Sequence, residues 1–463
     1  MALLCLPLPA SAHSFGKLYN LPIPFWMYLY GAAAALLLSF LVIGYGVSEA
    51  SALRNDRSRD LPLRFPRLAL PLLQALSVAS LAFTILAGFI GTQQPYFNFN
   101  MTWFWVVFLL GFTWLCALAG DLYAALNPWK LLSAWMGERP GRWRYPARLG
   151  SWPALLLYMA FIWLELFSQM SPRMLSALLL GYTALNLAGA WAFGRRDWFE
   201  RCEFLGLFFA LIGRCAPLEW HAGGLRLRQP FIALLREPAQ DYSQLLFVLF
   251  MLSSTAFDGL HETVPWVEGF WVSLYHQLTP LLGSNIVDTY PLLRQLYRLY
   301  QSAGLLLSPL LYLAIYLSFL WLAKKLAGSP LPLHTLALRF ACSLVPIALV
   351  YHVTHYYTLL LTQGPQVLRL ASDPFGFGWN LLGTAQWRQV AIPDAGVVWH
   401  TQVALILAGH IVSVYLAHLE AMKLMPGRRQ TLLSQLPMLL LMVAYTTIGL
   451  WVLSLPMTSQ TPG

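Results

Sequence analysis

Residues 101–120 read MTWFWVVFLLGFTWLCALAG, a run without a single charged side chain. An α-helix rises about 1.5 Å per residue, so a run of this length crosses the hydrocarbon core of a bilayer, which is about 30 Å thick. The run therefore predicts a transmembrane helix.

Comparable apolar runs recur along the rest of the chain. Together with 101–120 they predict ten spans, at about 25–47, 71–91, 101–120, 152–170, 174–193, 243–258, 301–323, 339–362, 399–423 and 434–455. The shorter run 203–213 suits a re-entrant or interfacial, surface-lying helix better than a span. No repeat divides the chain, so we expect an all-α fold, with one polytopic transmembrane helix bundle over 13–463.

The composition excludes several classes of protein. Of the 463 residues, 58% are hydrophobic and 10% are charged, whereas soluble domains carry about 25% charged residues. A soluble enzyme, a disordered chain and a disulfide scaffold are therefore excluded. The five cysteines include no CxxC pair, and we expect no structural disulfide.

The positive charges give an orientation. If the N-terminus lies outside, 23 of the 29 Lys and Arg residues fall on inner loops and 6 on outer segments. This split predicts an N-out, C-out topology by the positive-inside rule. The net charge of +10 is then an orientation signal, and we expect no nucleic-acid partner.

The first residues resemble a signal peptide in part. Segment 1–12, MALLCLPLPASA, ends in a small-x-small cleavage pattern but is short and has no basic start. We interpret it as a possible leader: either the true start lies further upstream or the segment is not cleaved.

Ionisable side chains in apolar runs indicate functional sites, because they are costly to place in a membrane. The strongest signal is His352-x-x-His355, since residues three apart share one helix face. Both imidazoles fall in the predicted outer half of their span. They are either metal ligands or two core histidines bonded to backbone and hydroxyl groups.

A second group stands at the predicted outer end of the sixth span. Asp258, His261 and Glu262 lie at i, i+3 and i+4 and share a face if the helix continues. Asp and His are ligands suited to zinc, and Glu262 could act as a base. The alternative is a solvated, acidic helix end.

A third span contributes His410, at a similar predicted depth. Alone it would be structural, but beside the other histidines it becomes a candidate ligand. Glu165 also falls in the outer half of its span, where an interhelical hydrogen bond is the favoured role. The shared depth of Asp258, His261, the histidine pair and His410 predicts a metal pocket open to the outer side.

Two long outer segments, 259–300 and 363–398, could cover such a pocket. The second contains the turn-rich stretch SDPFGFGWN at 372–380, and both carry aromatic side chains. They would suit an apolar substrate or form an interfacial aromatic belt.

Several stretches resemble one family of membrane proteins. They are AHSFGKLYNLPIP (12–24), NPWKLL (127–132), FDGLHET (257–263), THYYTLLLTQGPQ (354–366), LASDPFGFGWNLLGTA (370–385), LAGHIVSVYLAH (407–418) and QLPMLLLMVAYTTIGLWVLS (435–454). The chain thereby resembles the bacterial fenitrothion hydrolases, which are membrane-bound organophosphorus hydrolases. The resemblance assigns no catalytic residue. It implies a multi-pass protein of the bacterial inner membrane that hydrolyses (thio)phosphotriesters such as fenitrothion and releases a phenol.

The resemblance and the residues combine into one hypothesis. A divalent metal such as zinc would activate water, held by His352, His355, His410 and Asp258, with His261 as a further ligand. Glu262 would be the base, and a lipophilic substrate would enter from the bilayer to a site on the periplasmic side.

Two other classes remain open. In a transporter or metal-handling protein, the same side chains would form an outer ion site or a proton relay. In a structural role, the chain would be a membrane subunit of a larger complex with an unknown partner.

Overall fold

The computed structural model describes residues 24–47, 58–61, 68–137, 141–221, 224–282, 286–387, 394–425 and 427–455. The leader at 1–12 and the start of the first stretch that carries the resemblance lie outside the described residues.

The described chain is an all-α helix bundle, as predicted. Ten of its helical segments are long and apolar enough to cross a membrane: Phe25–Gly46, Ala69–Ile90, Phe99–Ala119, Ala147–Phe167, Pro172–Phe193, Tyr242–His261, Thr289–Ala327, Leu333–Gln363, Gly396–Leu424 and Arg428–Val452. Each coincides with one of the ten predicted spans. The protein is therefore a multi-pass membrane protein.

The secondary-structure elements follow in chain order. They are α1 (Phe25–Gly46), β1 (Arg59–Leu61), α3 (Ala69–Ile90), η1 (Pro95–Phe97), α4 (Phe99–Met101), η2 (Thr102–Gly111), α5 (Phe112–Ala119), α6 (Tyr123–Leu126), α7 (Pro128–Ala134), η3 (Ala147–Leu149), α8 (Trp152–Phe167), α9 (Pro172–Phe193), α10 (Arg195–Arg201), α11 (Phe204–Gly213), β2 (Leu218–His221), β3 (Gly224–Leu227), η4 (Ile232–Leu235), α12 (Tyr242–His261), α13 (Val264–Glu268), η5 (Gly269–Leu274), α14 (Tyr275–Leu282), α15 (Ile286–Ala327), α16 (Leu333–Ala341), η6 (Cys342–Leu344), α17 (Val345–Gln363), α18 (Gln366–Ser372), α19 (Ala395–Leu424) and α20 (Arg428–Ser454).

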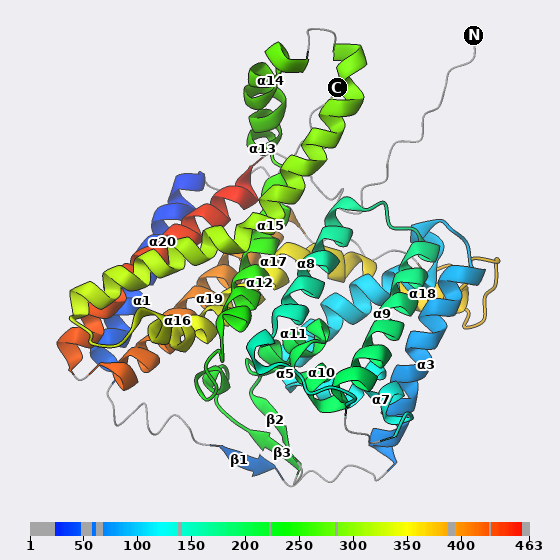
Figure 1. The fold of residues 1–463 in the computed structure, drawn as a ribbon, viewed down its shortest axis with the longest axis horizontal. Helices are drawn as coiled ribbons and strands as arrows, with labels where there is room; N and C mark the ends of the chain where they lie inside the picture. The colour runs from blue at the N-terminus through cyan, green and yellow to red at the C-terminus, as the bar shows by residue number, and fades with distance from the viewer. Residues whose placement is uncertain are drawn as a thin grey trace.

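The helices form two groups with a junction between them (Figure 1). In the first group α1, α15, α19 and α20 pack side by side, and in the second α3 packs on α9 while α5 and α8 pack on α11. Helices α12 and α17 contact each other and both groups. The junction is consequently the most buried part of the bundle: 78% of the apolar window of α12 is buried.

The short run that was predicted to be re-entrant or interfacial is helix α11. Seven of its ten residues are buried, among them Phe204, Phe208 and Phe209, and it packs on α5 and α8. It therefore lies inside the bundle and not on its surface. Glu203 caps its first turn by accepting a hydrogen bond from the backbone N–H of Gly206.

A small antiparallel sheet, in the order β1-β3-β2, adds to the helical fold. Asp60 on β1 pairs with Arg226 on β3 in the ladder, and their side chains form an ion pair of 2.8 Å. The hydrogen bond from Arg226 holds the pKa of Asp60 below its usual value.

Helix α15 extends well beyond the predicted span 301–323. Its 42 residues make it about 63 Å long, roughly twice the thickness of the bilayer core. Its first part and α14 stand out from the rest of the bundle in Figure 1. The segment 259–300, predicted as an outer segment, is thus largely helical in its described part.

A proline interrupts the hydrogen bonding inside α15. Pro309 has no backbone N–H to donate to the carbonyl of Leu305, four residues earlier. The hydroxyl of Ser308 donates to that carbonyl instead, at 2.8 Å, and forms a second hydrogen bond with the hydroxyl of Ser253 on α12, also at 2.8 Å, in which it acts as acceptor. These two bonds hold α15 against α12 at the proline.

Candidate functional site

The site lies at the junction of the two helix groups, where an aspartate meets a histidine. Nε2 of His355 on α17 is 2.7 Å from Oδ2 of Asp258 on α12, and the two side chains are 18% and 4% exposed. Next to Asp258, Gly259 allows α20 to approach, because a Cβ there would lie 3.1 Å from Val452. The structure therefore brings together two of the predicted site residues in direct contact.

Two further side chains extend this pair. The hydroxyl of Tyr356 lies 3.1 Å from Oδ2 of Asp258 and 3.4 Å from Oε1 of Glu165 on α8. The interhelical hydrogen bond expected of Glu165 is thereby confirmed. The four residues form one polar chain from α8 through α17 to α12, in the order Glu165, Tyr356, Asp258 and His355.

His261 turns away from this chain. Its Nδ1 donates to the backbone carbonyl of Asp258 at 2.8 Å and stays 4.0 Å from the Asp258 carboxylate. Its ring stacks on Phe257, with centroids 5.6 Å apart, and meets Phe167 edge-on. The contacts of its imidazole are those of a packed helix end.

His352 lies about one helical turn before His355 on α17. Its ring packs edge-on against Phe208 of α11 and against Tyr356. Its Nε2 is buried and has no hydrogen-bond partner among the described residues. Its position beside Tyr356 places it at the edge of the polar chain.

His410 on α19 is fully buried, at 0% exposure. Its Nδ1 donates to the carbonyl of Ile406 at 2.8 Å, and its ring meets Tyr351 edge-on. Its Nε2 has no hydrogen-bond partner among the described residues. The ring contact of His410 is thus with α17 and its hydrogen bond is within its own helix, and neither is with Asp258 or His355.

The predicted metal ligands do not all lie together in the structure. In the described ranges, no group of three or more His, Cys, Asp or Glu side chains is arranged to hold a metal ion. The Nε2 atom of His355 is directed at a carboxylate oxygen, and Glu262 is the C-cap of α12. Among the described residues these side chains thus form no three-ligand group of the kind that holds a catalytic zinc, and the metal site stays a prediction.

His355 also lines a cavity between α12, α15, α17 and α20. The lining residues are Leu252, Thr255, Ala256, Gly259, Tyr312, Ile347, Tyr351, Thr354, His355, Tyr445, Ile448, Gly449 and Val452. The volume is about 40 Å³, and on the same measure a cavity needs about 10–15 Å³ to hold one water molecule. The cavity therefore has room for at least one water molecule.

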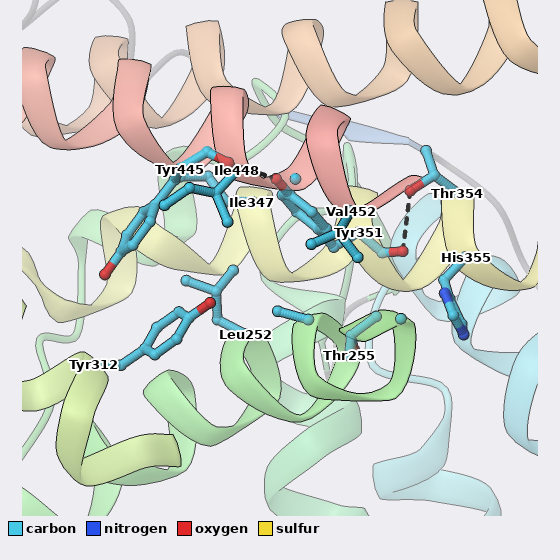
Figure 2. A pocket seen from close by; sticks show the side chains of 13 residues that line it. Leu252, Thr255, Tyr312, Ile347, Tyr351, Thr354, His355, Tyr445, Ile448 and Val452 are labelled. Carbon is cyan, nitrogen blue, oxygen red and sulfur yellow. Dashed lines mark hydrogen bonds between the residues drawn. The ribbon is translucent and has the colours of Figure 1, made fainter. Parts of the chain in front are cut away.

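The two ends of the cavity differ in chemistry. Figure 2 shows the imidazole of His355 at one end and the rings of Tyr312 and Tyr445 at the other. These two rings stack with centroids 5.3 Å apart. The hydroxyl of Tyr351 donates to the backbone carbonyl of Tyr445 at 3.0 Å, while the hydroxyl of Tyr445 has no partner among the described residues.

The expected covering segments contribute little to this cavity. None of its lining residues comes from 363–398, and only Gly259 comes from 259–300. The cavity is lined by the membrane helices themselves.

A second buried carboxyl group lies outside the spans, at Glu203. It accepts hydrogen bonds from the hydroxyls of Tyr182 and Tyr123, from the amide of Asn127 at 3.1 Å and from the N–H of Gly206 at 2.7 Å. Burial nevertheless raises the pKa of Glu203 to about 7, because desolvation outweighs these donors.

Sequence reasoning missed Tyr356 and Glu203 as polar centres. A tyrosine inside HYYTLLL has the pattern of an ordinary buried aromatic residue, and its position after a histidine was the available signal. Glu203 carried a weak signal as an acidic residue directly before an apolar run.

Comparisons of the chain with models of protein families, with curated proteins and with solved structures found no match. The polar chain and the cavity are therefore the features of the protein that bear on its function.

Proposed function

We propose that the protein is a membrane-embedded hydrolase of lipophilic (thio)phosphotriesters, with His355 as its general base. The contact between Asp258 and His355 at the edge of a water-sized cavity carries this proposal. A carboxylate that holds an imidazole in one tautomer is the arrangement by which many hydrolases activate a nucleophile.

The tautomer follows from the hydrogen bond. With Asp258 ionised, Nε2 of His355 carries a proton and donates it, so Nδ1 is left as the basic nitrogen. Nδ1 would take one proton from water, the water oxygen would bond to phosphorus, and the bond from phosphorus to the aryl oxygen would break. The second proton of the water would pass to the leaving aryl oxygen, so the products are an ionised phosphodiester and a phenol.

The apolar surroundings support a lipophilic substrate. The cavity opens among membrane helices and is lined mainly by aliphatic and aromatic side chains. Its volume suits the attacking water, and the ester would meet His355 at the exposed edge of the imidazole. The likeness of the FDGLHET and THYYTLLLTQGPQ stretches to fenitrothion hydrolases supports a phosphotriester as the ester concerned.

The proposed reaction needs no metal, because Asp258 and His355 activate the water. The metal predicted from the sequence stays a prediction, and the test includes the metal content of the purified protein.

The test is aryl phosphotriester hydrolysis by the purified full chain in lipid nanodiscs. We expect His355→Ala to lower the rate by about 10²- to 10⁴-fold, the usual contribution of a general base. The matched control is His334→Ala, since His334 is an exposed histidine on α16. A wild type that does not exceed the uncatalysed rate would exclude the hydrolase.

A second candidate, a proton-coupled transporter, is favoured by one observation. The polar chain joins α8, α12 and α17, and further polar groups are buried along α19, where His418 bonds to Gln435 of α20. Such groups could carry protons through the bundle. Proton uptake into liposomes that His355→Ala abolishes, without hydrolysis by the wild type, would favour this function.

A further inference from the structure

The hydroxyl of Tyr356 stands between two carboxyl groups and has a single proton. It is within hydrogen-bonding distance of Oδ2 of Asp258, at 3.1 Å, and of Oε1 of Glu165, at 3.4 Å. A phenol can donate to one of these oxygens at a time. The other contact is a hydrogen bond only if that carboxyl group supplies the proton.

The contact between Asp258 and His355 decides which of the two carboxyl groups supplies a proton to the hydroxyl of Tyr356. Oδ2 of Asp258 faces Nε2 of His355 as well as Tyr356, so it accepts from both when it is ionised. On the other side, Oε1 of Glu165 faces the same hydroxyl of Tyr356, at 3.4 Å. With Asp258 ionised, one assignment satisfies these three contacts: the acid of Glu165 donates to Tyr356, Tyr356 donates to Asp258, and His355 donates to Asp258.

Electrostatics favours the same assignment. Two ionised carboxylates that share one phenol in a low-dielectric bundle would repel each other, and one of them keeps a proton as a rule.

We propose that Glu165 and Tyr356 form a proton exit for the site, in which Glu165 holds the proton and Tyr356 connects it to Asp258. The role of this exit in turnover rests on the proposed function, whereas the proton on Glu165 does not. Glu165 lies two residues before α8 ends at Phe167 and is partly exposed. Because of this position at the end of α8, we assign the exchange of protons with solvent to Glu165.

The transfer is balanced at each step. Glu165 releases its proton to solvent, Tyr356 passes its own proton to Glu165 and takes one from Asp258, and Asp258 takes that proton from Nε2 of His355. The imidazole, which gained a proton at Nδ1 from water, returns to its first tautomer by exchange with the cavity water. One proton leaves per ester hydrolysed, as an ionised phosphodiester product requires.

The proton on Glu165 is tested by infrared spectroscopy of the full chain in nanodiscs. We expect a carbonyl band of a protonated carboxylic acid that shifts in D₂O. It should disappear in Glu165→Gln and change frequency in Tyr356→Phe, while Tyr357→Phe leaves it in place. Tyr357 is the matched control because it is the adjacent tyrosine and stacks on Trp114. Glu203→Gln identifies any band from Glu203, which is also a buried carboxyl group.

A band that persists unchanged in Glu165→Gln overturns the inference. Because the spectrum needs no turnover, a wild type without hydrolase activity refutes the proposed function and still leaves this result decided.

The exit itself is tested by turnover in dilute buffer. We expect Tyr356→Phe to be at least about tenfold slower than wild type and to recover in concentrated imidazole, which carries protons in place of the chain. A loss that imidazole does not restore would mean that Tyr356 only positions Asp258, and full activity in dilute buffer would mean that it has no role. Either result contradicts the exit.

Discussion

The imidazole of His355 and the carboxylate of Asp258 form a 2.7 Å contact that ties α17 to α12 where the two helix groups meet. The two residues are far apart in sequence and lie on different helices. The site therefore exists only when the bundle is assembled.

Replacement of Asp258 by asparagine tests the role of the carboxylate. Asp258→Asn keeps the shape of the side chain but removes the charge that orients and stabilises the imidazole of His355. We expect phosphotriester hydrolysis to fall by about 10²-fold or more, with KM changed less than kcat. An Asp258→Asn enzyme with wild-type kcat would contradict the proposed dyad.

The pH dependence of stability should report Glu203. Its pKa is about 7 in the folded protein against an ordinary value of 4.5, so the folded protein binds more protons than the unfolded chain between these values. The contribution of Glu203 to the free energy of unfolding is thus largest below about pH 4.5 and is lost as the pH rises through about 7.

Thermal unfolding in detergent across this pH range measures the effect. Glu203→Gln should flatten the pH dependence of Tm, whereas Glu237→Gln, at an exposed carboxylate, should leave it as in the wild type. Identical pH profiles for wild type and Glu203→Gln would show that Glu203 does not titrate in this range.

Two helical glycines should respond in opposite ways to alanine. A Cβ at Gly449 would lie 1.7 Å from the hydroxyl of Tyr351, whereas a Cβ at Gly181 would meet nothing within 4 Å. We expect Gly449→Ala to destabilise the protein by about 1–3 kcal/mol through overpacking. Gly181→Ala should be neutral or slightly stabilising, because alanine favours helix. Equal Tm values for the two variants would contradict the packing of α17 against α20.

The tyrosines of the cavity give a paired test of its hydroxyl groups. Tyr351→Phe removes a hydrogen bond to the Tyr445 carbonyl and should cost about 1 kcal/mol. Tyr445→Phe removes a buried hydroxyl without a partner among the described residues and should be neutral or stabilising. Chemical denaturation compares the two. A clear loss of stability in Tyr445→Phe would indicate a water bound in the cavity.

The spans could be predicted from the sequence because hydropathy is a local property. The run 25–47 and the helix Phe25–Gly46 differ by one residue at the end. The extension of α15 could not be predicted in this way, since the residues before 301 mix polar, aromatic and apolar side chains. On this extension, the rings of Tyr297 and Tyr300 pack against Phe270 of η5.

The candidate site could be predicted in part. Depth along each span can be estimated from sequence, and it placed Asp258 and His355 at one level. Depth does not show which helices are neighbours, and for this reason His410, which packs against Tyr351, could not be separated from them. The part of Tyr356 in the polar chain could not be predicted from sequence, because it depends on its hydroxyl lying between Glu165 on α8 and Asp258 on α12.

The proline in α15 has a mechanical consequence. Pro309 sits one turn before Tyr312, which forms the far wall of the cavity, and the part of α15 before Pro309 reaches out past the bundle. A helix that lacks one backbone hydrogen bond bends there more readily than elsewhere. The part of α15 before Pro309 can thus bend relative to the rest of the helix next to the cavity. A force on the first turn of α15 would bend the helix at Pro309 and move the ring of Tyr312.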